Sequence, residues 1–205
     1  WDAECWAEGY DYENLLKSDA NFPDHDRDDQ YRTGTFYAMH PMAESDYEIP
    51  DDSYEFIEGD FIFSISDGQA TLVSYTGNEK EVVIPETANG FPVRFLGVQA
   101  FQDNLTIEKV TFAASIISTP DGWCTSYPFA EYGVFAQCRN LKTVVFPENS
   151  QLSYLGKFTF GSCDSLTDIE LPSSIRVLAD ACFSQCTGID SIVLPEGLEE
   201  LGGAL

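Results

Sequence analysis

The sequence predicts a solenoid, an α/β fold rich in β-structure in which short parallel strands of successive repeats stack on one another. A phrase that begins with Phe and ends three residues later in Cys or Asn recurs four times, at Phe101, Phe135, Phe160 and Phe183. The spacings between these Phe residues are 34, 25 and 23. Apolar residues follow each Phe at fixed distances. Self-similarity at a period of roughly 20–30 residues is the signature of stacked repeats.

Each repeat is predicted to contain one short strand. An aliphatic residue lies six positions after the Phe, and two more apolar positions follow three and five residues later, an alternation that is typical of a strand. Proline ends the strand in several copies, because it has no N–H to donate to a neighbouring strand. A second extended stretch and a tight turn or one-turn helix then lead to the next Phe. The apolar sets are Ile107, Val110 and Phe112; Leu141, Val144 and Phe146; Leu166, Ile169 and Leu171; and Ile189, Ile192 and Leu194.

The stretches 61–66 and 70–75 are predicted to form a hairpin, because both favour β-structure and they flank the turn Asp67-Gly68. This hairpin would cap the first repeat. Residues 61–205 are therefore assigned to the repeat domain, and residues 1–60 to an acidic, aromatic-rich N-terminal extension. We expect the extension to be irregular, apart from one short amphipathic helix within residues 3–18, and to pack against the side or the end of the solenoid.

The registered pattern, L-x-x-I-x-L-P-x-x-[LI]-x-x-[LI]-G-x-x-[AT]-F-x-x-C, resembles the BspA-like leucine-rich repeats. The fullest copies run from Leu141 to Cys163 and from Leu166 to Cys186. The resemblance covers residues 61–205 and implies a right-handed superhelix of about four and a half repeats. Members of this family are mostly surface-exposed or secreted proteins of bacteria and some protozoan parasites. The resemblance therefore implies binding to other proteins or to host surfaces.

The last repeat is predicted to be incomplete. Leu201 lies five residues before the position of the next repeat Phe, which would be residue 206. A stack that stops there should expose apolar side chains at its end, namely Leu194, Leu198 and Leu201. We expect that the chain was cut from a longer array; the alternative is that another segment covers this end.

Charge excludes one class of function. The formal net charge is −25, and residues 1–60 hold 18 Asp and Glu against 3 Lys and Arg. Solubility is the favoured explanation, although a surface for cations or basic partners would also fit. Nucleic-acid binding needs a basic footprint, which this chain lacks. No apolar run approaches the ~18 residues of a membrane span, so no membrane insertion is expected. Residue 1 is Trp rather than Met, which suggests that a signal peptide was trimmed.

One repeat carries an insertion, residues 116–132, that adds about 11 residues to the 23-residue copy. Insertions in repeats form loops on one face, which is often the binding face. The alternative is that the inserted aromatic residues fold back and fill a gap in the core. The candidate binding residues here are Trp123, Tyr127, Phe129 and Tyr132.

Most of the six cysteines belong to the repeat pattern. One position, three residues after the Phe, is predicted to form a column of buried, unbridged side chains that donate to backbone carbonyls of adjacent turns. Cys182 falls in a column of small core residues. Cys5 and Cys124 remain, and a disulfide between them is a minor possibility. The column consists of Asn104, Cys138, Cys163 and Cys186.

Evidence for metal binding or catalysis is weak. Asp24, Asp26 and Asp28 have the spacing of the first three ligands of a calcium loop. The match then fails, because Asp29 replaces the turn glycine and Thr35 replaces the last glutamate; a solvated acidic turn is the favoured interpretation. No zinc motif, phosphate loop or nucleophile elbow occurs. We therefore expect no cofactor and no enzymatic activity.

The positions between the buried strand residues form two exposed columns, which are the best candidates for a binding surface. The first column is polar and the second is mainly β-branched, which sheet propensity alone would also explain. The first consists of Glu81, Lys109, Thr143, Asp168 and Ser191, and the second of Val83, Thr111, Val145, Glu170 and Val193.

The sequence thus favours a non-catalytic module for protein–protein interaction or adhesion, located at a cell surface or outside the cell, with an unidentified protein partner. Two alternatives stay open. The chain could be an architectural spacer within a larger surface protein, or a calcium- or glycan-binding domain built on the N-terminal extension and the insertion.

Overall fold

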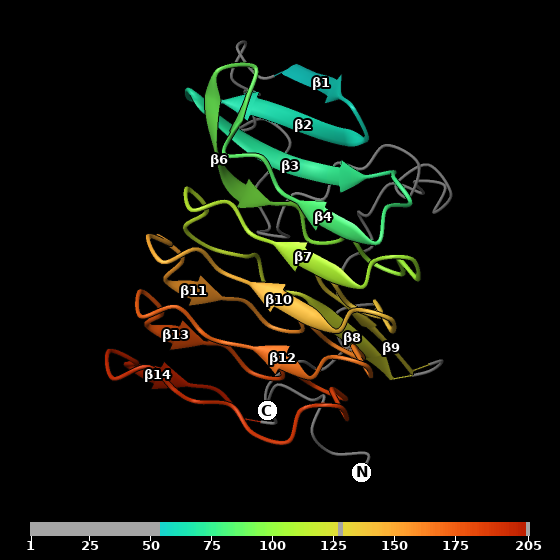
Figure 1. The fold of residues 1–205 in the computed structure, drawn as a ribbon, viewed down its shortest axis with the longest axis vertical. Helices are drawn as coiled ribbons and strands as arrows, with labels where there is room; N and C mark the ends of the chain where they lie inside the picture. Colours follow the sequence, from blue (N-terminus) through green and yellow to red (C-terminus); the bar gives the residue numbers. More distant parts are fainter. Residues whose placement is uncertain (1–53, 127–128, 204–205) are drawn as a thin grey trace, which may run out of the picture. The chain divides into compact units, whose positions relative to one another are not determined.

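The repeat domain contains a mixed sheet and two ladders of short parallel strands (Figure 1). The computed structural model describes residues 54–126 and 129–203. The predicted helix within residues 3–18, the acidic string at residues 24–28 and Cys5 lie outside the described residues. In the described part of the chain the elements are strands and turns, and the predicted solenoid is confirmed.

The mixed sheet stands at the start of the solenoid, in the strand order β1-β2-β3-β6-β5. The predicted hairpin is confirmed as its centre, with Asp67 and Gly68 at φ of 50° and 69°, as a two-residue hairpin turn requires. One strand comes from residues 54–58, which the sequence assigned to the extension, and it pairs antiparallel with the hairpin. The strands are β1 (Tyr54–Glu58), β2 (Phe61–Ser66), β3 (Gln69–Tyr75), β5 (Thr87–Ala88) and β6 (Phe91–Leu96).

The first parallel ladder consists of one short strand from each repeat, in the order β12-β10-β7-β4. Its register is the one that the repeat pattern predicts: Val82 lies beside Val110, and Val110 beside Val144, all three buried. The strands are β4 (Glu81–Val83), β7 (Lys109–Thr111), β10 (Thr143–Val145) and β12 (Asp168–Ile169).

The second parallel ladder comes from the extended stretches that follow the proline positions. It joins β11 (Tyr154–Leu155), β13 (Val177–Leu178) and β14 (Glu200–Leu201). Two isolated bridges at Ser118, one to Phe95 of β6 and one to Tyr154 of β11, connect this ladder to the mixed sheet. The ladder therefore continues across the repeat that carries the insertion.

The insertion itself folds as an antiparallel hairpin of β8 (Trp123–Ser126) and β9 (Phe129–Tyr132). Gly133 ends it and leads into the turn of the next repeat Phe. A Cβ at Gly133 would overlap the backbone carbonyl of Phe158, and glycine therefore lets the chain leaving the hairpin lie directly against the next turn.

The one-turn helices that the sequence allowed at the repeat Phe are absent from the described residues, where turns replace them. In all four copies the residue two positions after the Phe is left-handed, with φ between 57° and 63°. A right-handed helix cannot continue through such a residue, which explains the difference. The left-handed residues are Asp103, Gln137, Ser162 and Gln185.

Four stacked rings form the centre of the core, as predicted. Phe101, Phe135, Phe160 and Phe183 are buried, and consecutive ring centroids lie 4.7, 5.4 and 5.4 Å apart with nearly parallel planes. Tyr75 of the capping hairpin extends the column, with its ring 5.4 Å from that of Phe101. The hairpin thus covers the first repeat with a ring of its own.

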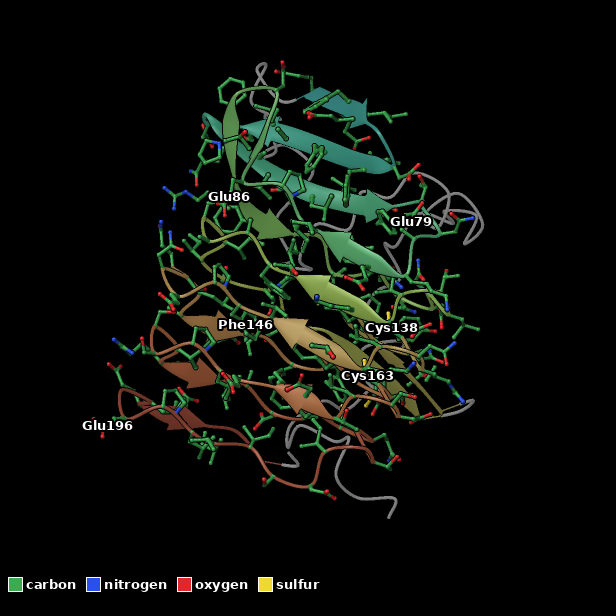
Figure 2. The ribbon with its side chains drawn as sticks, viewed as in Figure 1. Glu79, Glu86, Cys138, Phe146, Cys163 and Glu196 are labelled. Carbon is green, nitrogen blue, oxygen red and sulfur yellow. The ribbon has the colours of Figure 1, made fainter. Side chains whose placement is uncertain are left out.

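The predicted column of Asn and Cys side chains is confirmed at its centre, where Cys138 and Cys163 are buried in consecutive turns without a disulfide (Figure 2). Each thiol donates to the repeat Phe carbonyl of the preceding turn, with Sγ–O distances of 3.0 Å from Cys138 to Phe101 and 3.2 Å from Cys163 to Phe135. The outer members differ from the prediction. Cys186 and Asn104 are only half-buried, because each stands at one end of the column.

Burial decreases over the last repeat. Leu166 is buried, whereas Ile189, which occupies the same column one repeat later, is half-buried. Leu194 and Leu201 are 42% and 49% exposed, and Leu198 is half-buried. The predicted exposed apolar end is therefore confirmed for two of its three leucines.

Candidate binding surface

The outer face of the first parallel ladder brings the two predicted columns together in register. Glu81 pairs with Lys109, and Thr143 lies between Lys109 and Asp168; in the second column Thr111 lies between Val83 and Val145. We call this surface the parallel-sheet face; it consists of Glu81, Val83, Lys109, Thr111, Thr143, Val145 and Asp168.

Strand alternation positions these side chains. Val82, Val110 and Val144 point into the core between them, so the residues on either side must point outward. Val83 is 66% exposed. The remaining predicted members lie beyond the strands: Glu170 directly follows β12, whereas Ser191 and Val193 are exposed but belong to no strand. The ladder thus supports the columns over four repeats and not over the fifth.

A row of charged side chains borders the parallel-sheet face and was missed from the sequence. Glu108 lies between two lysines, with carboxylate–Nζ distances of 2.6 Å to Lys80 and 2.6 Å to Lys142. Lys109 and Glu81, within the face, lie 3.4 Å apart. The signal was available, because Lys80, Glu108 and Lys142 each stand one residue before a ladder strand, in one column of alternating charge.

The two lysines lower the pKa of Glu108 to about 2, through hydrogen bonds first and charge attraction second. A lowered pKa means that this carboxylate stabilises the fold above its ordinary value of 4.5 and that the stabilisation is lost as the pH falls from 4.5 toward about 2. We expect the NMR titration of the Glu108 carboxyl carbon to have its midpoint near pH 2. Because Glu108 and its two lysines are in contact with solvent, added salt should weaken their attraction and move the midpoint upward.

Lys142→Gln is expected to raise that midpoint, because it removes one of the two cations. Lys157→Gln is the matched control, since Lys157 pairs with Asp180 instead, at 3.4 Å. A Glu108 titration that is unchanged by Lys142→Gln would contradict the ion-paired row.

The second ladder presents a polar face of its own. Tyr154 donates its hydroxyl to the carboxylate of Asp121 at 2.7 Å, and the Lys157 amide donates to the same oxygen at 2.9 Å. Burial and then the Asp121 carboxylate raise the pKa of Tyr154, so the phenol stays protonated and a donor. These contacts tie the Asp121 side chain of the insertion to the following repeat.

The insertion brings two of its four candidate aromatic residues together. Trp123 and Tyr132 are cross-strand partners in the hairpin, with ring centroids 5.0 Å apart and an interplanar angle of 12°. Both are half-buried. Tyr127 lies outside the described residues, and only the backbone of Phe129 is described. The stacked pair stabilises the hairpin, and whether these residues also bind a partner stays a prediction.

The candidate calcium ligands Asp24, Asp26 and Asp28 lie outside the described residues, as does Cys5 of the proposed disulfide. Within residues 54–126 and 129–203, no group of three or more His, Cys, Asp or Glu is arranged to hold a metal ion. The same residues contain no helix that is long and apolar enough to span a membrane.

Comparison with known sequences identifies the repeat. Residues 129–205 match the family described as "BspA type Leucine rich repeat region (6 copies)". The resemblance that the sequence pattern predicted is therefore confirmed for this segment, which is less than half of the chain. No curated protein sequence matches the chain.

Three solved structures show the same fold. A leucine-rich repeat protein of T. pallidum has a TM-score of 0.61 at 23% identity, over 73% of this chain and 64% of that one. A leucine rich cell surface protein of Faecalibacterium prausnitzii has a TM-score of 0.53 at 23% identity, over 72% and 44%. A leucine-rich repeat protein of Bacteroides capillosus has a TM-score of 0.53 at 28% identity, over 67% and 96%. The chain thus spans less than two thirds of the first two proteins.

Proposed function

Because residues 129–205 match the BspA type leucine-rich repeats, we propose that the chain is a non-catalytic module that binds another protein through the parallel-sheet face. The observation that carries this proposal is the register of that face. Seven side chains from four strands form two columns in register, one polar and one β-branched. Glu81, Val83 and Asp168 are exposed, and the other four are half-buried. Repeat proteins use such extended, regular surfaces for binding.

The chemistry of the face suits a protein partner. Val83 and Val145 offer apolar side chains on either side of Thr111, which adds a methyl group and a hydroxyl, and the polar column beside them offers further hydrogen-bonding groups. In the bordering row one carboxylate, Glu108, pairs with two lysines, Lys80 and Lys142, so the row keeps one positive charge that an acidic group of a partner could meet. An apolar centre with a polar rim is the usual anatomy of a protein interface.

We further propose that the module works at a cell surface or outside the cell. One of the structurally similar proteins, that of F. prausnitzii, is described as a cell surface protein. Since this chain spans only 44% of that protein, the proposal concerns the module and not a whole protein.

The test uses the full chain and a panel of purified extracellular proteins. Candidates are first found by photo-crosslinking from a benzoyl-phenylalanine placed at Thr143. Binding is then measured for Val83→Arg and Thr143→Arg, each expected to weaken Kd at least about tenfold, a loss of about 1.4 kcal/mol. Thr187→Arg, on an exposed turn that belongs to no ladder strand, is the matched control and should bind like the parent chain.

Two outcomes would contradict the proposal. Binding that survives both sheet-face variants but is lost in Trp123→Ala would place the interface on the insertion instead. A panel in which no protein binds would favour the purely architectural role. Thermal unfolding of each variant should match that of the parent chain, so that a loss of binding is not a loss of folding.

A further inference from the structure

Glu131 is a carboxylate buried between the inserted hairpin and two repeat turns. It lies in β9 and is 1% exposed. Its Oε2 accepts a hydrogen bond from the Ser162 hydroxyl at 2.7 Å, and its Oε1 accepts one from the Ser184 hydroxyl at 2.6 Å. One side chain of the insertion therefore contacts two successive turns of the solenoid, 31 and 53 residues away in the sequence.

Two neighbouring residues, Gly161 and Gln137, allow and support this contact of Glu131. Gly161 leaves the room that the carboxylate occupies, because a Cβ there would lie 2.7 Å from Oε2. The Gln137 side-chain amide donates from Nε2 to the Glu131 backbone carbonyl at 3.3 Å, which ties the strand to the turn at Phe135 as well. The serine hydroxyls come from the same turns that carry Phe160 and Phe183.

The partners of the Glu131 carboxylate are neutral hydroxyls, and no ion pair within the described residues includes it. Among the described residues, the Asp164 carboxylate acts on it, and since it has the same sign it disfavours a second negative charge. A buried carboxylate with no cation beside it costs free energy when it is ionised. Burial raises the pKa of Glu131, and Asp164 raises it further, against the two serine hydrogen bonds, which lower it.

We propose that Glu131 is a proton-controlled latch, which holds the β8–β9 hairpin on the turns at Ser162 and Ser184 more tightly in acid than in neutral solution. When the hairpin leaves the turns, the carboxylate enters water and titrates at its ordinary value of 4.5. The docked state therefore binds the proton more strongly than the undocked state. By linkage, docking is strongest below pH 4.5 and weakens as the pH rises toward the docked pKa.

Hydrogen exchange of the β8–β9 amides in the full chain tests the latch, because it measures local opening. Protection is measured across pH and corrected for the intrinsic exchange rate. The parent chain should show a progressive loss of protection as the pH rises above 4.5. Each tenfold loss of protection corresponds to a difference of one pH unit between the pKa of Glu131 in the docked state and its pKa in the undocked state. Glu131→Gln, which cannot ionise, should show no such loss.

Two further variants keep the test decisive. Ser184→Ala removes a donor that favours the ionised form, so the loss of protection should extend to higher pH. Glu148→Gln changes an exposed glutamate after β10 and should keep the pH profile of the parent chain. The proposal is overturned if Glu131→Gln and the parent chain lose protection alike, or if protection rises with pH. Should Glu131→Gln fail to fold, a Ser184→Ala profile identical to that of the parent chain would overturn it equally.

Discussion

Phe160→Ala is expected to destabilise the protein by about 3–5 kcal/mol, the usual cost of removing a fully buried Phe side chain. Phe160 is 0% exposed, and its ring stacks on those of Phe135 and Phe183, each with a centroid 5.4 Å away. Because adjacent turns are held apart by their backbone ladders, they cannot close over the cavity. Denaturant unfolding followed by circular dichroism measures the change.

Phe146→Ala is the matched control, since it removes the same ring from the edge of the core. Phe146 is half-buried, and its ring packs against that of Phe112, with centroids 4.7 Å apart. The loss of stability in Phe146→Ala should be clearly smaller than in Phe160→Ala, because water can reach the space that the Phe146 ring leaves. Equal losses for the two variants would show that the stacked column has no special part in stability.

Gly133→Ala is expected to cost roughly 1–3 kcal/mol or more, the range found for overpacked sites. The added Cβ would overlap the carbonyl oxygen and carbonyl carbon of Phe158, which are backbone atoms and cannot rotate away. The hairpin would have to move off the turn. Besides the lower stability, the β8–β9 amides should therefore lose protection from hydrogen exchange. Thermal unfolding and hydrogen exchange measure the two effects.

Gly203→Ala serves as the control for this substitution. A Cβ at Gly203 would meet nothing within 4 Å, and its amide, which donates to Asp180, would be kept. The backbone of Gly133 is not left-handed, so conformational strain does not enter the comparison. A stable Gly133→Ala chain would mean that the hairpin can dock without close backbone contact.

The repeat register was predictable because identical positions in successive copies must become neighbours in a stack. The Phe column, the buried Cys138 and Cys163, and the pairing of Glu81 with Lys109 all follow from that single rule. The charged row of Lys80, Glu108 and Lys142 obeys it too, although it was overlooked. The binding role of the parallel-sheet face remains a proposal, because register places side chains and does not name what they bind.

Local conformation was less predictable. The sequence allowed a one-turn helix at each repeat Phe, and the structure has a turn through a left-handed residue instead. Four different residues of three types, Asp, Gln and Ser, adopt it, so no residue type signals the turn. The packing of the Tyr75 ring against that of Phe101 was also outside the pattern, because the capping hairpin is not a copy of the repeat.

By itself, then, the sequence determined the solenoid, its register and its two central columns, since these depend only on the period. The tertiary structure alone decided where the insertion lies and what Glu131 contacts. Its partners Ser162 and Ser184 are ordinary turn residues, separated from it by one and two repeats. No periodicity relates them, because their meeting depends on the path by which the β8–β9 hairpin folds back onto the turns.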